Sequence, residues 1–199
     1  QRALKLTVLV SIPVGVGIIV VAPAFVDAFL GDQWLEMVVP MQILTGYGLL
    51  RSIRSPTSPL FKALGRPDYM AKIQSIRLVL LAILIYPLTQ AFGLPGTALA
   101  VLATGLVDAP LGAYLAVRLI DDDMRTFVGI VAYPTVGSAV MAACAWLVRT
   151  SVSGLMGPFV TFFATVIVGV VSYALAMLAL ERQFDFGLWE LVTQVRQSI

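Results

Sequence analysis

The sequence has no histidine, one cysteine and few charged side chains, and each shortage excludes a class of chemistry. The lack of histidine excludes Ser-His catalytic triads, histidine general acids and bases, and histidine-ligated metals. The single cysteine, Cys144, excludes an internal disulfide and a cysteine metal cluster, and its apolar surroundings predict a buried small residue. The net charge of only +2 argues against a nucleic-acid partner. We therefore expect a protein that is not an enzyme of these kinds and that holds no cofactor and no metal.

Apolar residues, in contrast, are abundant and come in long runs. They make up 59% of the 199 residues, against 12% charged residues. A hydrocarbon core about 30 Å thick needs about 20 helical residues, and six stretches are long and apolar enough. The six predicted spans are residues 6–30, 35–64, 76–92, 97–120, 127–148 and 159–180. The fold class predicted is all-α, a polytopic transmembrane helix bundle forming one domain over 1–199, with residues 181–199 as a cytoplasmic amphipathic tail.

The short connections and their charges predict an orientation in the bilayer. The sequence Gly93-Leu94-Pro95-Gly96 predicts a tight turn between the third and fourth spans. Ten of the thirteen Lys and Arg residues lie on the side of the N-terminus, and only Arg149 lies on the other side. By the positive-inside rule, both chain ends face the cytoplasm. The acidic loop 121–123 is expected to be a solvated helix cap, because no second acidic cluster accompanies it.

The second span contains charges that a merely spanning helix would not carry. With Trp34 and Arg66 as its interface markers, Arg51 and Arg54 fall near the bilayer centre. A charge at that depth costs roughly 2.5–3.5 kcal/mol on insertion scales, so such residues normally face a partner or a water-filled cavity. At 100° per residue a mostly polar stripe forms on one helix face. Its members are the predicted substrate-binding residues Tyr47, Arg51, Arg54, Ser58 and Lys62.

One acidic residue, Asp108, lies at the middle of the fourth span, on a helix face with Thr97, Val101 and Thr104. It is our candidate for coupling or gating of transport. The alternative is structural: Arg51 and Arg54 could pair with Asp108 and only hold the helices together. An ion pair and a cavity are compatible with each other. Arginine suits a phosphate partner, because its planar guanidinium binds two oxygens at once.

The order and spacing of three segments resemble a known family. These are Phe29-Leu30-Gly31-Asp32-Gln33-Trp34, the run from Pro56 to Pro67 after Pro40-Met41-Gln42-Ile43-Leu44, and Phe92-Gly93-Leu94-Pro95-Gly96-Thr97. Together they resemble the second half of a polysaccharide-biosynthesis flippase, the Wzx-like branch of the multidrug/oligosaccharidyl-lipid/polysaccharide exporter superfamily. The resemblance is strongest over residues 26–120.

The resemblance implies a multi-pass protein of the bacterial inner membrane. Such proteins flip an anionic lipid-linked oligosaccharide, carried on a polyprenyl pyrophosphate, between leaflets by alternating access, for O-antigen, capsule or exopolysaccharide. It implies as partners the lipid bilayer, that lipid-linked substrate and a missing N-terminal lobe. The chain begins without methionine, directly before a run of spanning length. We therefore expect a fragment of a two-lobe protein.

Three other functions stay open at this point. A cation-coupled drug exporter of the same superfamily would favour acidic cavity residues, and only Asp108 qualifies. A membrane-embedded glycan polymerase or ligase would need a large loop opposite the N-terminal side, where connections reach only roughly ten residues. A non-catalytic membrane scaffold subunit would not need arginine inside a span.

Overall fold

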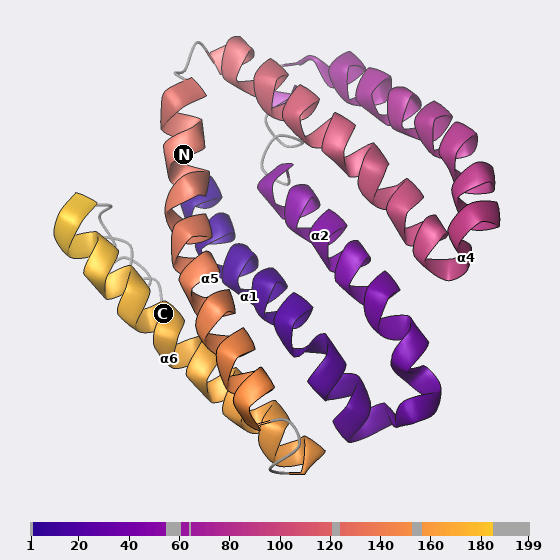
Figure 1. The fold of residues 1–199 in the computed structure, drawn as a ribbon. Helices are drawn as coiled ribbons and strands as arrows, with labels where there is room; N and C mark the ends of the chain where they lie inside the picture. The colour runs from indigo at the N-terminus through magenta and orange to yellow at the C-terminus, as the bar shows by residue number, and fades with distance from the viewer. Residues whose placement is uncertain (1, 55–60, 64, 121–123, 153–156, 185–199) are drawn as a thin grey trace.

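The computed structural model describes residues 2–54, 61–63, 65–120, 124–152 and 157–184, and these residues form helices with no strand among them. Five α-helices and two short helical segments follow one another along the chain (Figure 1). They are α1 (Arg2–Phe25), the π-helical η1 (Val26–Leu30), the 3-10 helix η2 (Asp32–Met37), α2 (Val38–Arg54), α4 (Pro67–Ile120), α5 (Met124–Val152) and α6 (Pro158–Phe184). The predicted all-α fold class is confirmed.

Helix α4 is a hairpin of two arms rather than one straight rod. The backbone leaves helical geometry at Gly93, which has φ 61° and ψ −135°. A positive φ is accessible to glycine at little cost, because it has no Cβ. Figure 1 shows α4 doubling back on itself there, so its arms correspond to the predicted spans 76–92 and 97–120. The turn predicted at this position is confirmed, but the first arm begins at Pro67 rather than at residue 76.

The entry into α2 also differs from the predicted span 35–64. Gly31, with φ 83°, ends η1, and its N–H donates to the Val26 carbonyl at 2.9 Å. The 3-10 helix follows, so α2 begins only at Val38, with Pro40 in its first turn, where the missing N–H costs least. Four described helices, one of them the α4 hairpin, are long and apolar enough to cross a membrane. The 17-residue α2 is described only to Arg54, and the count of six spans stays a prediction.

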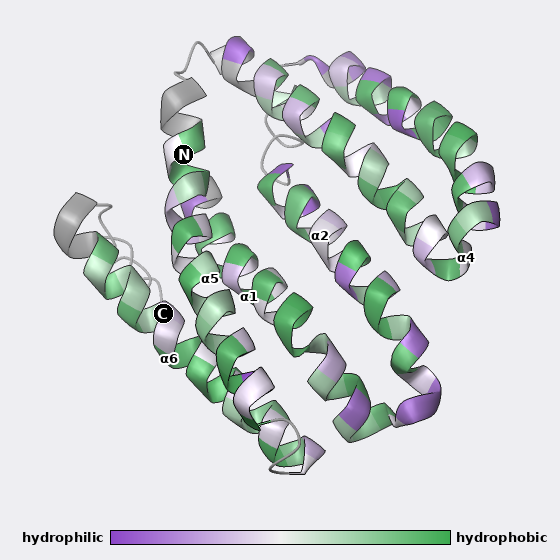
Figure 2. Ribbon diagram, in the orientation of Figure 1, coloured by the Kyte–Doolittle hydropathy of each residue, from purple (hydrophilic) through white to green (hydrophobic). Residues whose placement is uncertain are grey.

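The helices pack through small side chains and turn their large apolar side chains outward. Helix α2 contacts α1 on one side and α4 on the other, while α1 also contacts α5 and α6. Many buried residues are small, namely Ala22, Ala24, Ala98, Ala100, Ala109, Ala113 and Ala145. Leu78 and Tyr86, in contrast, are 70% and 72% exposed. Hydrophobic residues, drawn green, occur along every helix in Figure 2, which is the composition expected of helices that meet lipid.

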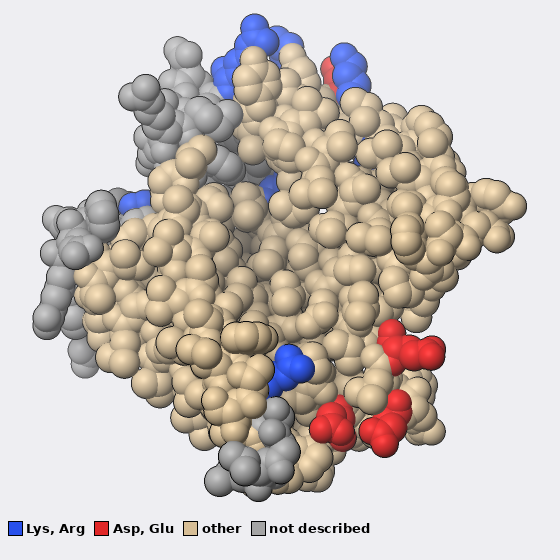
Figure 3. All heavy atoms as spheres, in the orientation of Figure 1, with Lys and Arg blue, Asp and Glu red and all other residues tan. Residues whose placement is uncertain are grey.

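Charged residues gather at opposite ends of the helices. Exposed acidic residues surround the turn between α1 and α2, namely Asp27, Asp32 and Glu36. Exposed basic residues lie near the far end of α2 and the start of α4, namely Lys62, Arg66 and Lys72. Figure 3 shows red atoms at the lower end of the molecule and blue atoms mainly at the upper end. This distribution agrees with the charge asymmetry of the sequence, while the orientation itself stays a prediction.

Candidate functional site

An ion pair joins α2 to the second arm of α4. Nη2 of Arg54 lies 3.7 Å from Oδ2 of Asp108, and the two side chains are 17% and 5% exposed. At a helical rise of 1.5 Å per residue, Arg54 lies roughly 24 Å from the start of α2, and Asp108 lies about 22 Å from the Gly93 turn. The two charges therefore meet where α2 reaches Arg54, its last described residue, and near the middle of the second arm of α4. The pairing that the sequence left open as an alternative is present in the structure.

Glycines in the second arm of α4 give α2 the room to approach. A Cβ at Gly105 would lie 2.7 Å from Cδ2 of Tyr47, which is too close for two carbon atoms. A Cβ at Gly112 would lie 3.2 Å from Cδ of Arg54. Helix contacts in membranes commonly use small residues in this way. The α4 surface is thus shaped around the two polar side chains of α2, Tyr47 and Arg54.

A second guanidinium joins the site from the first arm of α4. Cζ of Arg77 lies 5.2 Å from the centre of the Tyr47 ring, within the range of a cation–π contact. Arg77 is one of the ten basic residues that the sequence assigns to the side of the N-terminus, and it lies inside α4, because that helix begins at Pro67 rather than at residue 76. The sequence contains a signal for this earlier helix start. Proline is favoured in the first turn of a helix, and Asp68 adds the acidic residue favoured there. We call Tyr47, Arg54, Arg77 and Asp108 the charged seam.

Two polar atoms of the charged seam keep unused hydrogen-bonding capacity. The Tyr47 hydroxyl and Oδ2 of Asp108 are buried and have no hydrogen-bond partner among the described residues. The 3.7 Å contact from Arg54 to Asp108 is an ion pair, but it is too long for a hydrogen bond. Buried polar atoms are normally satisfied by protein, water or ligand. The seam therefore offers a donor and an acceptor to a bound molecule.

The other predicted site residues lie at the edge of the charged seam or outside the described residues. Arg51 is exposed, whereas Arg54 is half-buried. Residues three apart on a helix differ by about 60° in direction, which is enough to put one in the interface and one beside it. Lys62 is exposed, and Ser58 lies outside the described residues. Thr104 and Asp108, which the sequence places on one helix face, are both buried.

The chemistry of this site favours anions rather than metals. Arg54 and Arg77 bring two guanidiniums to the charged seam, against the single carboxylate of Asp108, and a third, Arg51, lies on α2 three residues before Arg54. Guanidinium groups pair with carboxylate and phosphate oxygens through two parallel hydrogen bonds. Within the described parts of the chain, no group of three His, Cys, Asp or Glu residues is placed to hold a metal ion.

Comparison with known proteins gives one family and several relatives. The family model described as "Polysaccharide biosynthesis protein" matches residues 1–39. The chain is 26% identical over 147 residues, 74% of its length, to the teichuronic acid biosynthesis protein TuaB of Bacillus subtilis. It is 27% identical over 176 residues, 88% of its length, to the lipopolysaccharide biosynthesis protein WzxC of Escherichia coli. An uncharacterized membrane protein from the cps region of Klebsiella pneumoniae is 22% identical over 109 residues, 55% of this chain and 22% of that protein.

These matches cover only part of each relative. The chain spans 30% of the length of TuaB and 30% of the length of WzxC. No solved structure matches it. The matches support the resemblance to Wzx-like polysaccharide biosynthesis proteins that the motifs indicated, and that resemblance is confirmed. The apolar helices are those expected of a membrane protein, and the names of TuaB and WzxC both concern polysaccharide biosynthesis.

Proposed function

We propose that this chain takes part in moving an anionic lipid-linked oligosaccharide across the bacterial inner membrane by alternating access. The observation that carries the proposal is the excess of positive charge around the charged seam. Arg54 is paired with Asp108, and two further guanidiniums, Arg51 and Arg77, lie on the same two helices. A pair that only fastened helices together would need a single arginine. The remaining positive charge suits a phosphate group passing along α2.

The cost of these charges supports a role in transport rather than in scaffolding. Each arginine inside a span costs roughly 2.5–3.5 kcal/mol on insertion scales, and such residues generally line a path for an ion or substrate. A scaffold subunit gains nothing from that cost. A cation exporter would favour acidic residues, yet the acidic residue inside this seam, Asp108, already faces Arg54. A phosphate-bearing substrate accounts for the sign of the charge and for the choice of arginine.

Asp108 is proposed to gate this site by competing with the substrate for Arg54. At 3.7 Å the contact between Nη2 of Arg54 and Oδ2 of Asp108 is longer than a hydrogen bond, so a phosphate oxygen that comes within hydrogen-bonding distance of Arg54 can displace this carboxylate oxygen. Once the phosphate leaves, Asp108 again becomes the partner of Arg54. In this scheme Arg51 on α2 extends the path, the sequence-predicted residues Ser58 and Lys62 continue it beyond that helix, and Tyr47 offers its hydroxyl as a hydrogen-bond donor.

The names of the relatives indicate the class of substrate. TuaB is named for teichuronic acid biosynthesis and WzxC for lipopolysaccharide biosynthesis, and both names concern surface polysaccharides. We propose a polyprenyl-pyrophosphate-linked oligosaccharide as the substrate and no catalytic reaction in the chain itself. The proposed location is the bacterial inner membrane, with the N-terminus in the cytoplasm. A cysteine at Gln33 should react with an impermeant thiol reagent in intact cells, and one at Lys72 should not; the reverse labelling would overturn the orientation.

Complementation of a flippase-null strain tests the proposal. Arg51→Ala and Arg54→Ala, each in the full-length protein, should abolish surface polysaccharide, and Lys at either position should restore it only in part, because lysine lacks the planar fork. Arg66→Ala is the matched control, because this exposed arginine lies outside the charged seam. Immunoblotting of membranes separates lost transport from lost protein. Full polysaccharide production by Arg51→Ala, Arg54→Ala together would contradict the proposal.

A further inference from the structure

Helix α1 contains two prolines, and each leaves a backbone carbonyl without its helical donor. In an α-helix the N–H of residue i donates to the carbonyl of residue i−4, and proline has no N–H. Pro13 therefore leaves the Leu9 carbonyl without that bond, and Pro23 leaves the Ile19 carbonyl without it. Lipid offers no water to replace such bonds, so each exposed carbonyl is costly there.

A side chain from another helix reaches each of these two carbonyls. The Tyr173 hydroxyl of α6 donates to the Leu9 carbonyl at 3.0 Å, across 164 positions of sequence. The Gln42 side-chain amide of α2 donates to the Ile19 carbonyl at 2.7 Å. Both long-range bonds thus end on the carbonyl that a proline leaves open. At both prolines, therefore, a side chain from another helix replaces the backbone donor that the proline removes.

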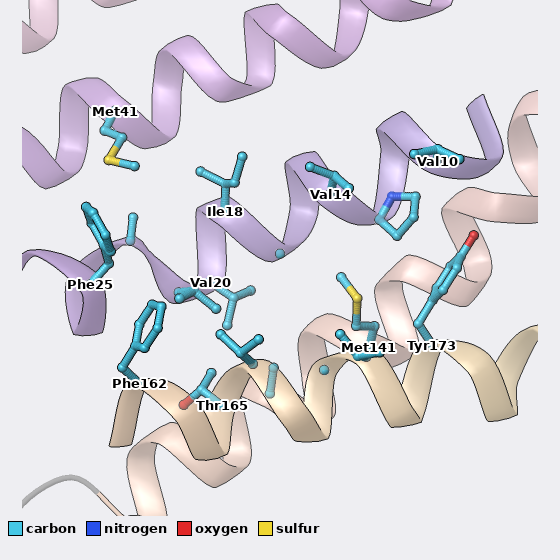
Figure 4. Close-up of a pocket in the computed structure, with 18 of the residues that line it drawn as sticks. Val10, Val14, Ile18, Val20, Phe25, Met41, Met141, Phe162, Thr165 and Tyr173 are labelled. Atoms are coloured by element: carbon cyan, nitrogen blue, oxygen red, sulfur yellow. The ribbon is translucent and has the colours of Figure 1, made fainter. Parts of the chain in front are cut away.

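The two bonds tie α1 to different neighbours at different heights. The Tyr173 bond fastens the N-terminal part of α1 to α6, and the Gln42 bond fastens its C-terminal part to α2. Between them lies an apolar cavity of about 610 Å³, lined mainly by α1 and α6 (Figure 4). In the close-up, Tyr173 stands near Val10 at one end of the cavity, while Phe25 and Met41 lie at the other. The middle of α1 therefore has loosely filled space beside it and a weak point at each end.

We infer that α1 is a helix with two hinges, at Pro13 and Pro23, and that Tyr173 and Gln42 are the latches that hold them. A helix interrupted by proline bends where its ladder is broken. When a latch opens, the segment beyond that proline can bend at the missing backbone bond. Each hinge is held by a side chain of a different neighbouring helix, so the two ends of α1 move independently. This inference concerns α1 and its bonds to α2 and α6, and it stands apart from the function proposed for the charged seam.

Distances between spin labels measure the two hinges separately. One pair joins Leu6→Cys, before the first hinge, to Leu78→Cys; the other joins Asp27→Cys, beyond the second hinge, to Phe92→Cys. All four positions are exposed, and the background is the full protein with Cys144→Ala. Tyr173→Phe should broaden the distance distribution of the Leu6 pair and leave the Asp27 pair unchanged. Gln42→Leu should do the opposite.

Control variants and restored backbone bonds make the test specific. Tyr86→Phe and Gln90→Leu remove the same groups from exposed positions on α4 and should leave both distributions unchanged. Pro13→Ala restores a backbone N–H that can donate to the Leu9 carbonyl. It should therefore return Tyr173→Phe, but not Gln42→Leu, to a narrow distance distribution and to normal folding. Pro23→Ala should rescue only Gln42→Leu. The inference would be overturned if Tyr173→Phe and Gln42→Leu gave distance distributions as narrow as those of the controls. It would also be overturned if either proline substitution rescued both variants.

Discussion

The interface between α2 and α4 holds charged side chains, whereas the contacts of α1 with α2 and α6 use neutral hydroxyl and amide groups. In the first interface Arg54 and Asp108 face each other, with buried hydrogen-bonding capacity left over. In the contacts of α1 the Tyr173 hydroxyl and the Gln42 amide are each bonded to a backbone carbonyl. Neutral groups there repair the fold itself. The charges between α2 and α4 exceed what one helix-to-helix pair needs, and the proposed substrate site rests on that excess.

The largest effect on stability is expected where a buried charge loses its partner. Arg54→Ala leaves the Asp108 carboxylate buried beside no cation of its own, and breaking such a pair typically costs 3–5 kcal/mol, so we expect about that loss in the free energy of unfolding. Arg51→Ala, at an exposed position one turn earlier, should change it by only about 0.5 kcal/mol. Denaturant unfolding in detergent micelles measures both variants.

A second substitution separates charge from packing in the same pair. Asp108→Asn added to Arg54→Ala removes the orphaned charge and should recover most of the lost stability. Equal stability of Arg54→Ala and Arg51→Ala would mean that the ion pair contributes nothing to the fold. Asp108→Asn alone should reduce transport while the protein remains in the membrane. If the Asp108→Asn protein is instead absent from the membrane, Asp108 has a purely structural role.

A smaller loss is expected where the approach of α2 to α4 is blocked. Gly105→Ala places a Cβ against the Tyr47 ring and should lower the free energy of unfolding by about 1–3 kcal/mol, the usual cost of overpacking. Gly48→Ala on α2 is the matched control, because its Cβ would meet nothing within 4 Å. The control should be neutral or stabilising, since alanine favours helix over glycine. The same loss in both variants would mean that the glycine contact is unimportant.

The smallest change in stability is expected at the hydroxyl of Tyr47. Tyr47→Phe keeps the ring that faces Arg77 and removes a buried hydroxyl with no hydrogen-bond partner among the described residues. We expect the free energy of unfolding to change by no more than about 0.5 kcal/mol. The transport rate is expected to fall, because the hydroxyl is a proposed donor to substrate. A large stability loss with unchanged transport would assign the hydroxyl to the fold.

Sequence alone predicted the helical class, the Gly93 turn and the candidates Arg54 and Asp108, because each leaves a local signal: apolar run length, a glycine-proline motif, or a charge inside a span. Arg77 was missed because the length of an apolar run gives a poor boundary for a helix whose first turns are polar. The separation of Arg51 from Arg54 was missed as well. A helical wheel gives the direction of each side chain. It does not show how far the neighbouring helix α4 extends, and so which of the two arginines it covers.

Binding of polyprenyl pyrophosphate to the purified full-length protein in nanodiscs tests the central claim most directly. The uncharged polyprenol serves as the reference ligand, because it shares the chain and lacks the phosphates. Arg51→Ala is the decisive variant, since its exposed position should leave the fold intact. We predict at least roughly a tenfold weaker affinity for the pyrophosphate, about 1.4 kcal/mol, with polyprenol binding unchanged. Equal affinity of wild type and Arg51→Ala for the pyrophosphate would contradict the account.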